Sequence, residues 1–270
     1  MNSFLKHKIL VATLFVAGCT SQQSTHESLN GVLWSQTSVE YKVAAIQSFT
    51  AARSSVEIAL NDTSWSAALE QTEEYQNLPP AVIVDVDETV LDTSPFQARL
   101  VNRGIGYDHI LWEAWVNEST ANAIPGAKEF VIFLKEKNVK IFYVTNRVLE
   151  NPTVRNIKQV LDPQVSAEDV LCKNEKPGWG SDKASRRKEI AQNYRVILLV
   201  GDNYNDFHFL GKVGPEERIK KAKIHQEYWG SKWIIVSNPS YGNWEESLYD
   251  YNYSMRHKNK LKAKYEYLKN

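Results

Sequence analysis

Two aspartates that follow a short apolar run carry the clearest chemical signal in this chain. Residues 81–84 are Ala-Val-Ile-Val, and Asp85 and Asp87 come directly after them. Such a run is typical of a buried strand in a parallel sheet, whose ligand sites lie at the carboxyl ends of the strands. Two carboxylates this close repel each other, so a cation or a shared proton has to compensate. A polar turn would also fit an isolated Asp-x-Asp, but Val90 stands where a calcium loop needs glycine.

Further apolar runs also end in polar residues. They span residues 139–144, 196–200 and 233–236. Thr145 follows the first of these runs, and Asp202 and Asp206 follow the second, with Lys183 in the segment between them. Segments with helical periodicity separate the runs, which predicts an α/β fold with a doubly wound parallel sheet. Because polar groups at successive strand ends rarely arise by chance, we expect these four side chains to share one site with the two aspartates.

The set of motifs resembles the haloacid-dehalogenase (HAD) superfamily and, more closely, its class C acid phosphatases. The matching segments are Asp85-Val-Asp87-Glu-Thr-Val-Leu-Asp92-Thr-Ser-Pro95, Tyr143-Val-Thr-Asn-Arg147, Lys183, Gly201-Asp202-Asn203, Tyr241-Gly-Asn-Trp244-Glu245, Trp34 to Tyr41, Trp112-x-x-Trp115-Val and Pro125-Gly126-Ala. The resemblance covers roughly residues 34–247. It implies a HAD-like sheet with a small helical cap or α subdomain, and it implies the activity of a bacterial lipoprotein phosphatase or 5′-nucleotidase.

The two aspartates of the first motif receive separate roles. Asp85 is the expected nucleophile, whose carboxylate attacks phosphorus and forms an aspartyl-phosphate. Asp87 is the expected general acid and base, and crowding beside Asp85 would favour its protonated form. The resemblance further implies Mg²⁺, which prefers oxygen ligands, held by the side chains of Asp85 and Asp202 and by the main-chain carbonyl of Asp87.

The remaining site residues would bind the phosphoryl group. Thr145 and the Asn146 amide are expected to contact its oxygens, and Lys183 would neutralise charge that spreads in the transition state. Asp206 is expected to orient Lys183 or a metal-bound water without touching the metal itself. Asp92 falls outside this chemistry and is expected to be structural.

Aromatic residues in the matching segments are candidates for substrate recognition. Phe96 and Tyr241 each follow a strand-end motif, so we expect them to stack on a nucleobase or a nicotinamide ring. The expected substrates are accordingly 5′-nucleotides or nicotinamide mononucleotide. An aromatic residue taken alone is more often part of the core, which is the competing interpretation for both rings. The histidines show no ligand spacing, which argues against a histidine-type mechanism.

The amino terminus has the pattern of an export signal. Residues 1–18 combine a basic start with a short apolar run, and Cys19 follows Val-Ala-Gly as in a bacterial lipobox. We therefore predict a lipoprotein signal peptide at 1–18, a lipid anchor on Cys19 and a polar tether over 19–30. An ordinary secretory peptide with an incidental cysteine is the alternative. Thr20 in place of Asp resembles outer-membrane sorting in Gram-negative cells, so the expected location is the cell envelope.

The folded region is expected to span residues 31–270, with a helical subdomain built from its two ends. Residues 38–60 have helical periodicity, with Ser35 or Thr37 as the candidate cap. The expected apolar stripe of this helix is Val39, Val43, Ile46, Phe49 and Ala52. Residues 248–270 are rich in lysine and tyrosine and predict a closing helix whose lysines form a solvated face.

Composition excludes one class of partner and leaves three functions open. The 32 basic and 32 acidic residues give a formal net charge of zero, so there is no electrostatic case for nucleic-acid binding. The leading hypothesis is a membrane-anchored phosphomonoesterase, and the resemblance also allows a homodimer. The alternatives are a non-catalytic surface lipoprotein that binds a ligand and a phosphotransferase that passes phosphate to an alcohol.

Overall fold

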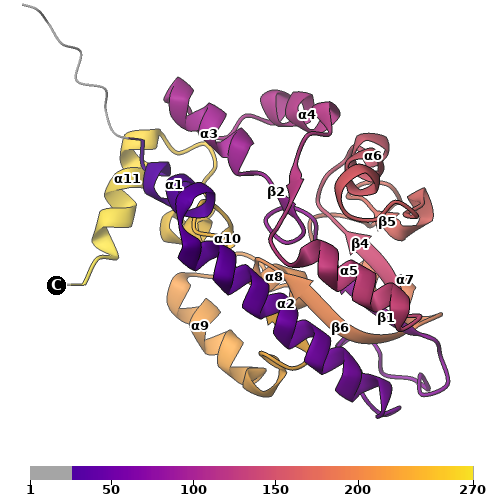
Figure 1. Cartoon of the computed structure of the whole chain (residues 1–270). Coiled ribbons are helices and arrows are strands. Elements are labelled where there is room, and N and C mark those ends of the chain that lie inside the picture. The colour runs from indigo at the N-terminus through magenta and orange to yellow at the C-terminus, as the bar shows by residue number, and fades with distance from the viewer. Residues whose placement is uncertain (1–25, 270) are drawn as a thin grey trace, which may run out of the picture.

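A five-stranded parallel sheet forms the centre of the protein. The computed structural model describes residues 26–269 (Figure 1). The strands lie in the order β5-β4-β1-β6-β7, and every neighbouring pair is parallel. Their bounds are β1 Pro80–Val84, β4 Lys140–Val144, β5 Val170–Leu171, β6 Arg195–Gly201 and β7 Trp233–Ile235. The predicted doubly wound α/β fold is therefore confirmed, and β1 stands between the two strands that carry the other predicted site residues.

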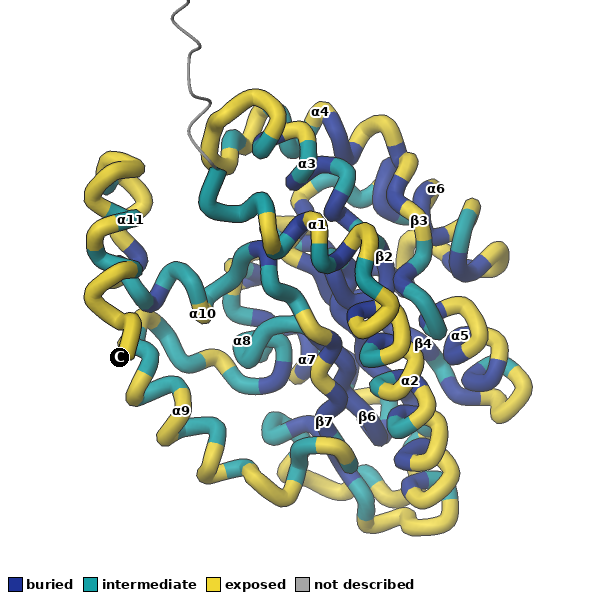
Figure 2. The backbone as a smooth tube through the Cα atoms, turned by 60° about the vertical axis from the view of Figure 1, so that its left-hand side comes forward, coloured by how far each residue is buried: buried dark blue, intermediate teal, exposed yellow. Residues whose placement is uncertain are grey.

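Helices cover both faces of this sheet. Successive strand residues point to opposite faces, so Val82 and Val84 belong to one buried cluster and Ala81 and Ile83 to the other. The first cluster contains side chains of α2, α5 and α6, and the second contains side chains of α7 and α8. All seven residues of β6 are buried (Figure 2), which explains why its sequence is a continuous apolar run without alternation.

The long helix α2 packs on a different face from the predicted one. It spans Val39–Leu60 and begins after Ser38, whose hydroxyl accepts a hydrogen bond from the Tyr41 backbone N–H at 3.1 Å. Ser35 and Thr37 instead lie inside α1, Leu29–Thr37. Of the expected stripe, Phe49 and Ala52 are buried, whereas Val39, Val43 and Ile46 are exposed. The buried face is Tyr41, Ala45, Phe49, Ala52, Val56 and Ala59, where the small alanines let the helix lie close to the sheet.

A helical insertion leaves the sheet directly after the first motif. It is framed by a short antiparallel hairpin of β2, Leu91–Asp92, and β3, Asn122–Ala123. Between these strands run α3, Ser94–Arg103, and α4, His109–Glu118, which form a small helical cap (Figure 1). Two strands of two residues each show no alternation, so the sequence analysis did not predict this hairpin.

The two ends of the described chain meet. Glu27, just before α1, pairs with Lys264 of α11, His257–Glu266, at 2.6 Å. The helix α1 begins two residues before the predicted end of the tether, so Leu29 and Asn30 are helical. The predicted leader and Cys19 lie outside the described residues. None of the helices within residues 26–269 is both long and apolar enough to cross a membrane.

The remaining helical elements complete the two layers and the carboxyl-terminal part. They are α5 Ala127–Glu136, α6 Glu150–Val160, α7 Ala184–Ala191, α8 Tyr204–Phe207, α9 Pro215–Ile224 and α10 Asn243–Glu246, with single 3₁₀ turns at Ala167–Asp169, Gln226–Tyr228 and Ser247–Tyr249. The predicted closing helix over 248–270 is shorter than expected, because only α11 within that range is α-helical.

Candidate active site

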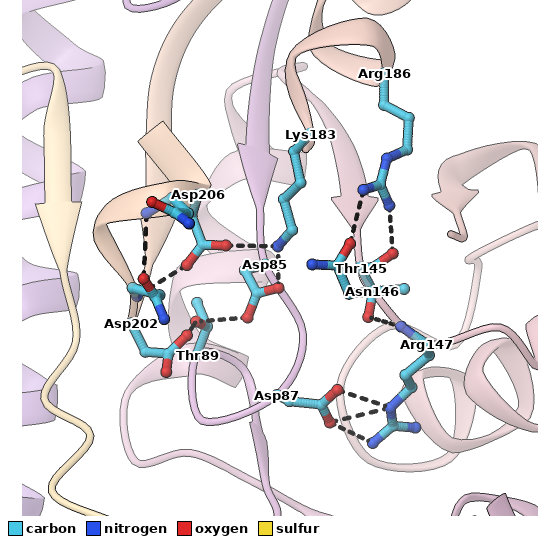
Figure 3. A network of polar contacts seen from close by, with 12 residues as sticks. Asp85, Asp87, Thr89, Thr145, Asn146, Arg147, Lys183, Arg186, Asp202 and Asp206 are labelled. Atoms are coloured by element: carbon cyan, nitrogen blue, oxygen red, sulfur yellow. Dashed lines mark hydrogen bonds and ion pairs between the residues drawn. The ribbon is translucent and has the colours of Figure 1, made fainter. Parts of the chain in front are cut away.

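The polar residues predicted at successive strand ends converge at one edge of the sheet. Asp85 follows β1, Thr145 follows β4, and Asp202 follows β6 (Figure 3). Because β1 pairs with both β4 and β6, their carboxyl ends are adjacent. The sheet therefore gathers these groups without any contribution from long loops, as expected for a site in a parallel α/β sheet.

Asp85 is the centre of the site. Its side chain accepts hydrogen bonds from Lys183 Nζ and, at 3.0 Å, from Thr89 Oγ1. Its backbone N–H donates to the Val200 carbonyl at 2.9 Å, which fixes the residue against β6. Burial raises the pKa of Asp85 to about 7; Lys183 opposes this rise, and Asp206 and Asp87 add to it. The carboxylate therefore depends on nearby cations to stay ionised.

Lys183 supplies one such cation from the first turn of α7. The residue is 3% exposed, and its Nζ contacts Asp85 and, at 2.6 Å, Asp206 Oδ1. Burial alone would lower the pKa of Lys183, but the carboxylates of Asp206 and Asp85 outweigh burial and raise it. Lys183 is thus a charged group beside Asp85 rather than part of a helix surface. This position suits its predicted role, which stays a prediction.

The third carboxylate at this edge is Asp202. Its Oδ2 accepts a hydrogen bond from Asn238 Nδ2 at 2.8 Å, and its Oδ1 lies 3.5 Å from Thr89 Oγ1. Burial, together with the charges of Asp206 and Asp85, raises its pKa well above the usual range. A bound cation would favour the ionised forms of both Asp85 and Asp202.

A divalent cation fits this group of carboxylates. Oxygen atoms of Asp85, Asp202 and Asp206 all lie within 4.8 Å of one another, and all three are hard oxygen donors of the kind that Mg²⁺ prefers. Asp206 is also held by Lys183 and by the Asn203 backbone N–H, which donates to its Oδ2 at 2.9 Å. The Asp206 side chain packs against the backbone of residue 201. That residue has to be glycine, because a Cβ there would lie 2.5 Å from the Asp206 side chain.

The residues after β4 are fixed by a buried arginine that the sequence analysis did not single out. Arg186 is fully buried, and it donates to the Thr145 carbonyl and, at 2.8 Å, to Asn146 Oδ1. Asn146 Nδ2 in turn donates to the Ser181 carbonyl at 3.1 Å. The side-chain amide of Asn146 is therefore engaged on both sides. Among the described residues its backbone N–H has no hydrogen-bond acceptor, so this is the amide group suited to bind a phosphoryl oxygen.

A second buried arginine changes the expected environment of Asp87. Arg147 Nε lies 3.0 Å and 3.1 Å from the two Asp87 carboxylate oxygens, and its Nη2 lies 2.7 Å from Oδ1. The sequence prediction considered only the crowding beside Asp85, and the structure adds a guanidinium that pairs with the Asp87 carboxyl group. The role of Asp87 as acid and base stays a prediction. Arg147 belongs to the Thr-Asn-Arg motif, but nothing in the sequence indicated that its side chain is buried.

Arg147 also connects the sheet to the cap. Its guanidinium lies 5.5 Å from the ring centroid of Trp112 and 5.8 Å from that of Trp115, both on α4. The two indoles are stacked at 5.3 Å. The ion pair with Asp87 is therefore bounded on one side by aromatic rings, where charge interactions are stronger than in water.

The two predicted substrate aromatics lie in different surroundings. Phe96 is 1% exposed and packs edge-on against Trp112 at 5.0 Å. Tyr241 is half-buried, and its hydroxyl lies 3.4 Å from Thr93 Oγ1. Thr93 in turn contacts the buried Glu88, whose pKa is raised to about 8 mainly by burial. Stacking of Phe96 and Tyr241 on a substrate ring stays a prediction. In the structure, the Phe96 ring packs against the Trp112 ring.

We predict that the stability of the metal-free protein falls as pH rises from about 4 to about 8. The pKa values of Asp85 and Glu88 increase on folding, to about 7 and about 8, so their contribution is complete at acidic pH and is lost as they ionise. The measurement is the free energy of unfolding by denaturant in EDTA across this pH range.

Asp85→Asn should make the slope of the free energy of unfolding against pH less steep, by up to about 1.4 kcal/mol per pH unit below pH 7. Asp62→Asn is the matched control, because Asp62 is exposed and its pKa is lowered by hydrogen bonds from Ser64. It should leave the slope unchanged above pH 4. A profile of Asp85→Asn that is as steep as that of the unmodified chain would show that Asp85 does not titrate in this range.

Comparison with known proteins agrees with the geometry. The profile of the HAD superfamily, subfamily IIIB (Acid phosphatase), matches residues 6–244. The class C acid phosphatase from Bacillus anthracis superposes with a TM-score of 0.80 at 33% identity, covering 91% of this chain and 98% of that one. The same enzyme with tungstate bound gives a TM-score of 0.80 at 32% identity, covering 92% and 98%.

More distant relatives come from plants. The stem 28 kDa and a stem 31 kDa glycoprotein of Glycine max are each 26% identical over 147 residues, which is 52% of this chain. The alignments span 56% and 49% of those two proteins, about half of their length. The family profile and the Bacillus structure instead cover most of the chain, and this protein belongs to the acid phosphatases of HAD subfamily IIIB.

Proposed function

We propose that this protein is a Mg²⁺-dependent acid phosphatase that hydrolyses phosphomonoesters through an aspartyl-phosphate on Asp85. The observation that carries the proposal is the position of Asp85, which lies between the ammonium of Lys183 and a cluster of carboxylates suited to a divalent cation. Membership of subfamily IIIB supports the reaction class. The tungstate in the Bacillus anthracis structure supports it further, since tungstate is a tetrahedral oxyanion similar in shape and charge to phosphate.

The reaction divides the residues into a nucleophile and its helpers. Asp85 attacks phosphorus and displaces the alkoxide, and water later cleaves the acyl phosphate to restore the carboxylate. Thr145 and the Asn146 backbone N–H bind the equatorial oxygens, and Lys183 neutralises the charge that develops on them. Mg²⁺ held by the side chains of Asp85 and Asp202 and by the main-chain carbonyl of Asp87 would offset the repulsion between nucleophile and phosphate. Asp206 orients Lys183.

Asp87 performs the proton transfers. It donates a proton to the bridging oxygen as the alkoxide leaves and later takes a proton from the water that attacks from the same position, so its carboxyl group must be directed at that position in both steps. The bidentate pair with Arg147 fixes the plane of this carboxyl group. We infer that Arg147 positions Asp87 for these transfers.

The proposed substrates are 5′-nucleotides or nicotinamide mononucleotide. Such molecules combine a phosphomonoester with a flat ring, and the aromatic residues at the cap and around Tyr241 lie in segments next to the phosphate site. The competing functions are a phosphotransferase and a non-catalytic binding protein. Released phosphate and phosphoglycerol, measured in the same reactions with glycerol present, distinguish all three.

Asp85→Asn should lower kcat for p-nitrophenyl phosphate by at least about a thousandfold, because the amide is not a nucleophile. EDTA should abolish activity of the unmodified enzyme, and Mg²⁺ should restore it. Asp92→Asn is the matched control, since the Asp92 side chain accepts a hydrogen bond from the Ser94 backbone N–H at the start of α3, at 2.8 Å, and has no proposed part in the chemistry. Full activity of Asp85→Asn would sink the nucleophile assignment, and no turnover of any phosphomonoester by the unmodified enzyme would favour the binding protein.

Arg147→Gln should reduce kcat for a 5′-nucleotide by about 10-fold to 100-fold, which is less than the loss of the acid itself because Asp87 remains, and it should affect p-nitrophenyl phosphate far less. The nucleotide releases a basic alkoxide that needs a proton, whereas p-nitrophenolate leaves without one. Arg99→Gln is the control, because Arg99 makes a similar bidentate pair with Glu118 at the surface. Equal losses with both substrates would contradict the positioning role and would indicate a general structural defect.

We further propose that Cys19 carries a lipid that anchors the mature chain in the cell envelope, in the outer membrane. The lipobox-like sequence before Cys19 supports this proposal. Cells fed labelled palmitate should incorporate label into the unmodified chain and not into Cys19→Ser. Label on neither protein would indicate an ordinary secretory signal, and label on both would contradict attachment of the lipid at Cys19. Formation of a homodimer stays a prediction of the family resemblance.

A further inference from the structure

The helix α11 carries a concentration of positive charge that the proposed reaction does not use. Residues 256–269 contain six lysines or arginines and one glutamate, although the whole chain has a formal net charge of zero. The outward cations are Arg256, Lys258, Lys262 and Lys269. This segment therefore has a strong excess of positive charge in an otherwise balanced protein. Such an excess attracts anionic surfaces and ligands.

The two sides of α11 differ. On the inner side, Lys264 pairs with Glu27 and Glu245, and Lys260 lies 4.7 Å from the ring centroid of Tyr249. These contacts hold the helix against the body of the protein. Lys264 is thus neutralised by two carboxylates, and Lys260 is directed at an aromatic ring of the protein body.

The outer side of the segment combines cations with exposed tyrosine and leucine side chains. Lys258, Lys262 and Tyr265 are spaced by four and three residues, so they share one face of the helix. Tyr265 is 64% exposed, and Leu268, just after the helix, is 68% exposed. Glu266 is the one acidic residue of this segment and is also exposed. Lysines beside tyrosine and leucine are the composition of helices that lie at the surface of anionic membranes.

The position of α11 in the chain favours a membrane as its partner. His257 and Lys264 both contact Glu27, so the helix lies beside the point where the described chain begins (Figure 1). His26 is seven positions after Cys19. A chain of that length spans at most about 25 Å even when fully extended. A lipid on Cys19 would therefore keep α11 within about that distance of the bilayer.

The other cationic helix, α9, lacks this combination. It carries Glu216 and Glu217 in its first turn, and Glu217 lies 3.8 Å from Lys220 and 3.9 Å from Lys221. Its positive charge is partly balanced within the helix, whereas the outward cations of α11 are opposed by Glu266 alone within residues 256–269. The charge pattern thus distinguishes the two helices.

We propose that the outer face of α11 docks on the anionic headgroups of a phospholipid membrane. The placement of the helix rests on the lipid anchor proposed at Cys19. The contact between the helix and the membrane does not depend on that anchor, because an anionic surface also attracts these cations in a chain without lipid. Labelling of Cys19 and vesicle binding by a lipid-free chain therefore test the two proposals separately.

The test uses the chain from residue 19 with Cys19→Ser, mixed at low ionic strength with vesicles of phosphatidylglycerol and phosphatidylcholine or of phosphatidylcholine alone. It should sediment with the anionic vesicles only, and salt should weaken the binding. Lys258→Gln/Lys262→Gln/Lys269→Gln should weaken it about a hundredfold, at about fivefold for each cation. Lys128→Gln/Lys158→Gln/Lys188→Gln removes equal charge from exposed positions on α5, α6 and α7 and should change binding by less than about twofold.

Three outcomes would overturn the proposal. They are no binding to the anionic vesicles, equal binding to both kinds of vesicle, and equal losses in the two triple variants. If α11 instead mediates self-association, its triple variant would change the sedimentation coefficient of the free protein and leave vesicle binding intact. Turnover of p-nitrophenyl phosphate should be unchanged in both variants, which verifies that each is folded.

Discussion

The ion pair between Lys183 and Asp85 is the interaction on which the site depends. Three buried or half-buried carboxylates meet at the ends of β1 and β6, and removing such charges from water is strongly unfavourable unless they are paired. Lys183 reaches two of them at once, from the start of α7. A neighbouring buried arginine, Arg187, donates to the Asp206 carbonyl at 2.8 Å and pairs with Glu70, which ties the same region to the segment before β1.

The two aspartates of the first motif belong to separate electrostatic environments. Asp85 faces Lys183 and the other carboxylates, whereas Asp87 faces Arg147 and the indoles of the cap. Residues only two positions apart therefore have different partners from different elements. This separation is what the two proposed roles require, with attack on phosphorus by Asp85 and proton transfer by Asp87.

Sequence patterns predicted the strands of the sheet better than the packing of helices and side chains against it. The strands β1, β4, β6 and β7 were predicted because each is an apolar run followed by polar residues, and these polar residues do converge. The two-residue strand β5 is too short to show a pattern. On α2, hydrophobicity pointed to Val39, Val43 and Ile46, but close packing selected the face with the alanines. Burial of Arg147 and Arg186 depends on tertiary contacts that no local pattern reveals.

The contact of Arg147 with Trp112 and Trp115 links the cap, where a substrate would be selected, to the position of Asp87. Segments that connect the strands of a scaffold can vary with the substrate, whereas a group that transfers protons has to be held in a fixed position. Here α4 of the cap packs on the guanidinium that holds Asp87. A change of the indoles that admits a new substrate would also shift Asp87, the proposed proton donor, so selectivity and turnover in this protein are expected to evolve together rather than independently.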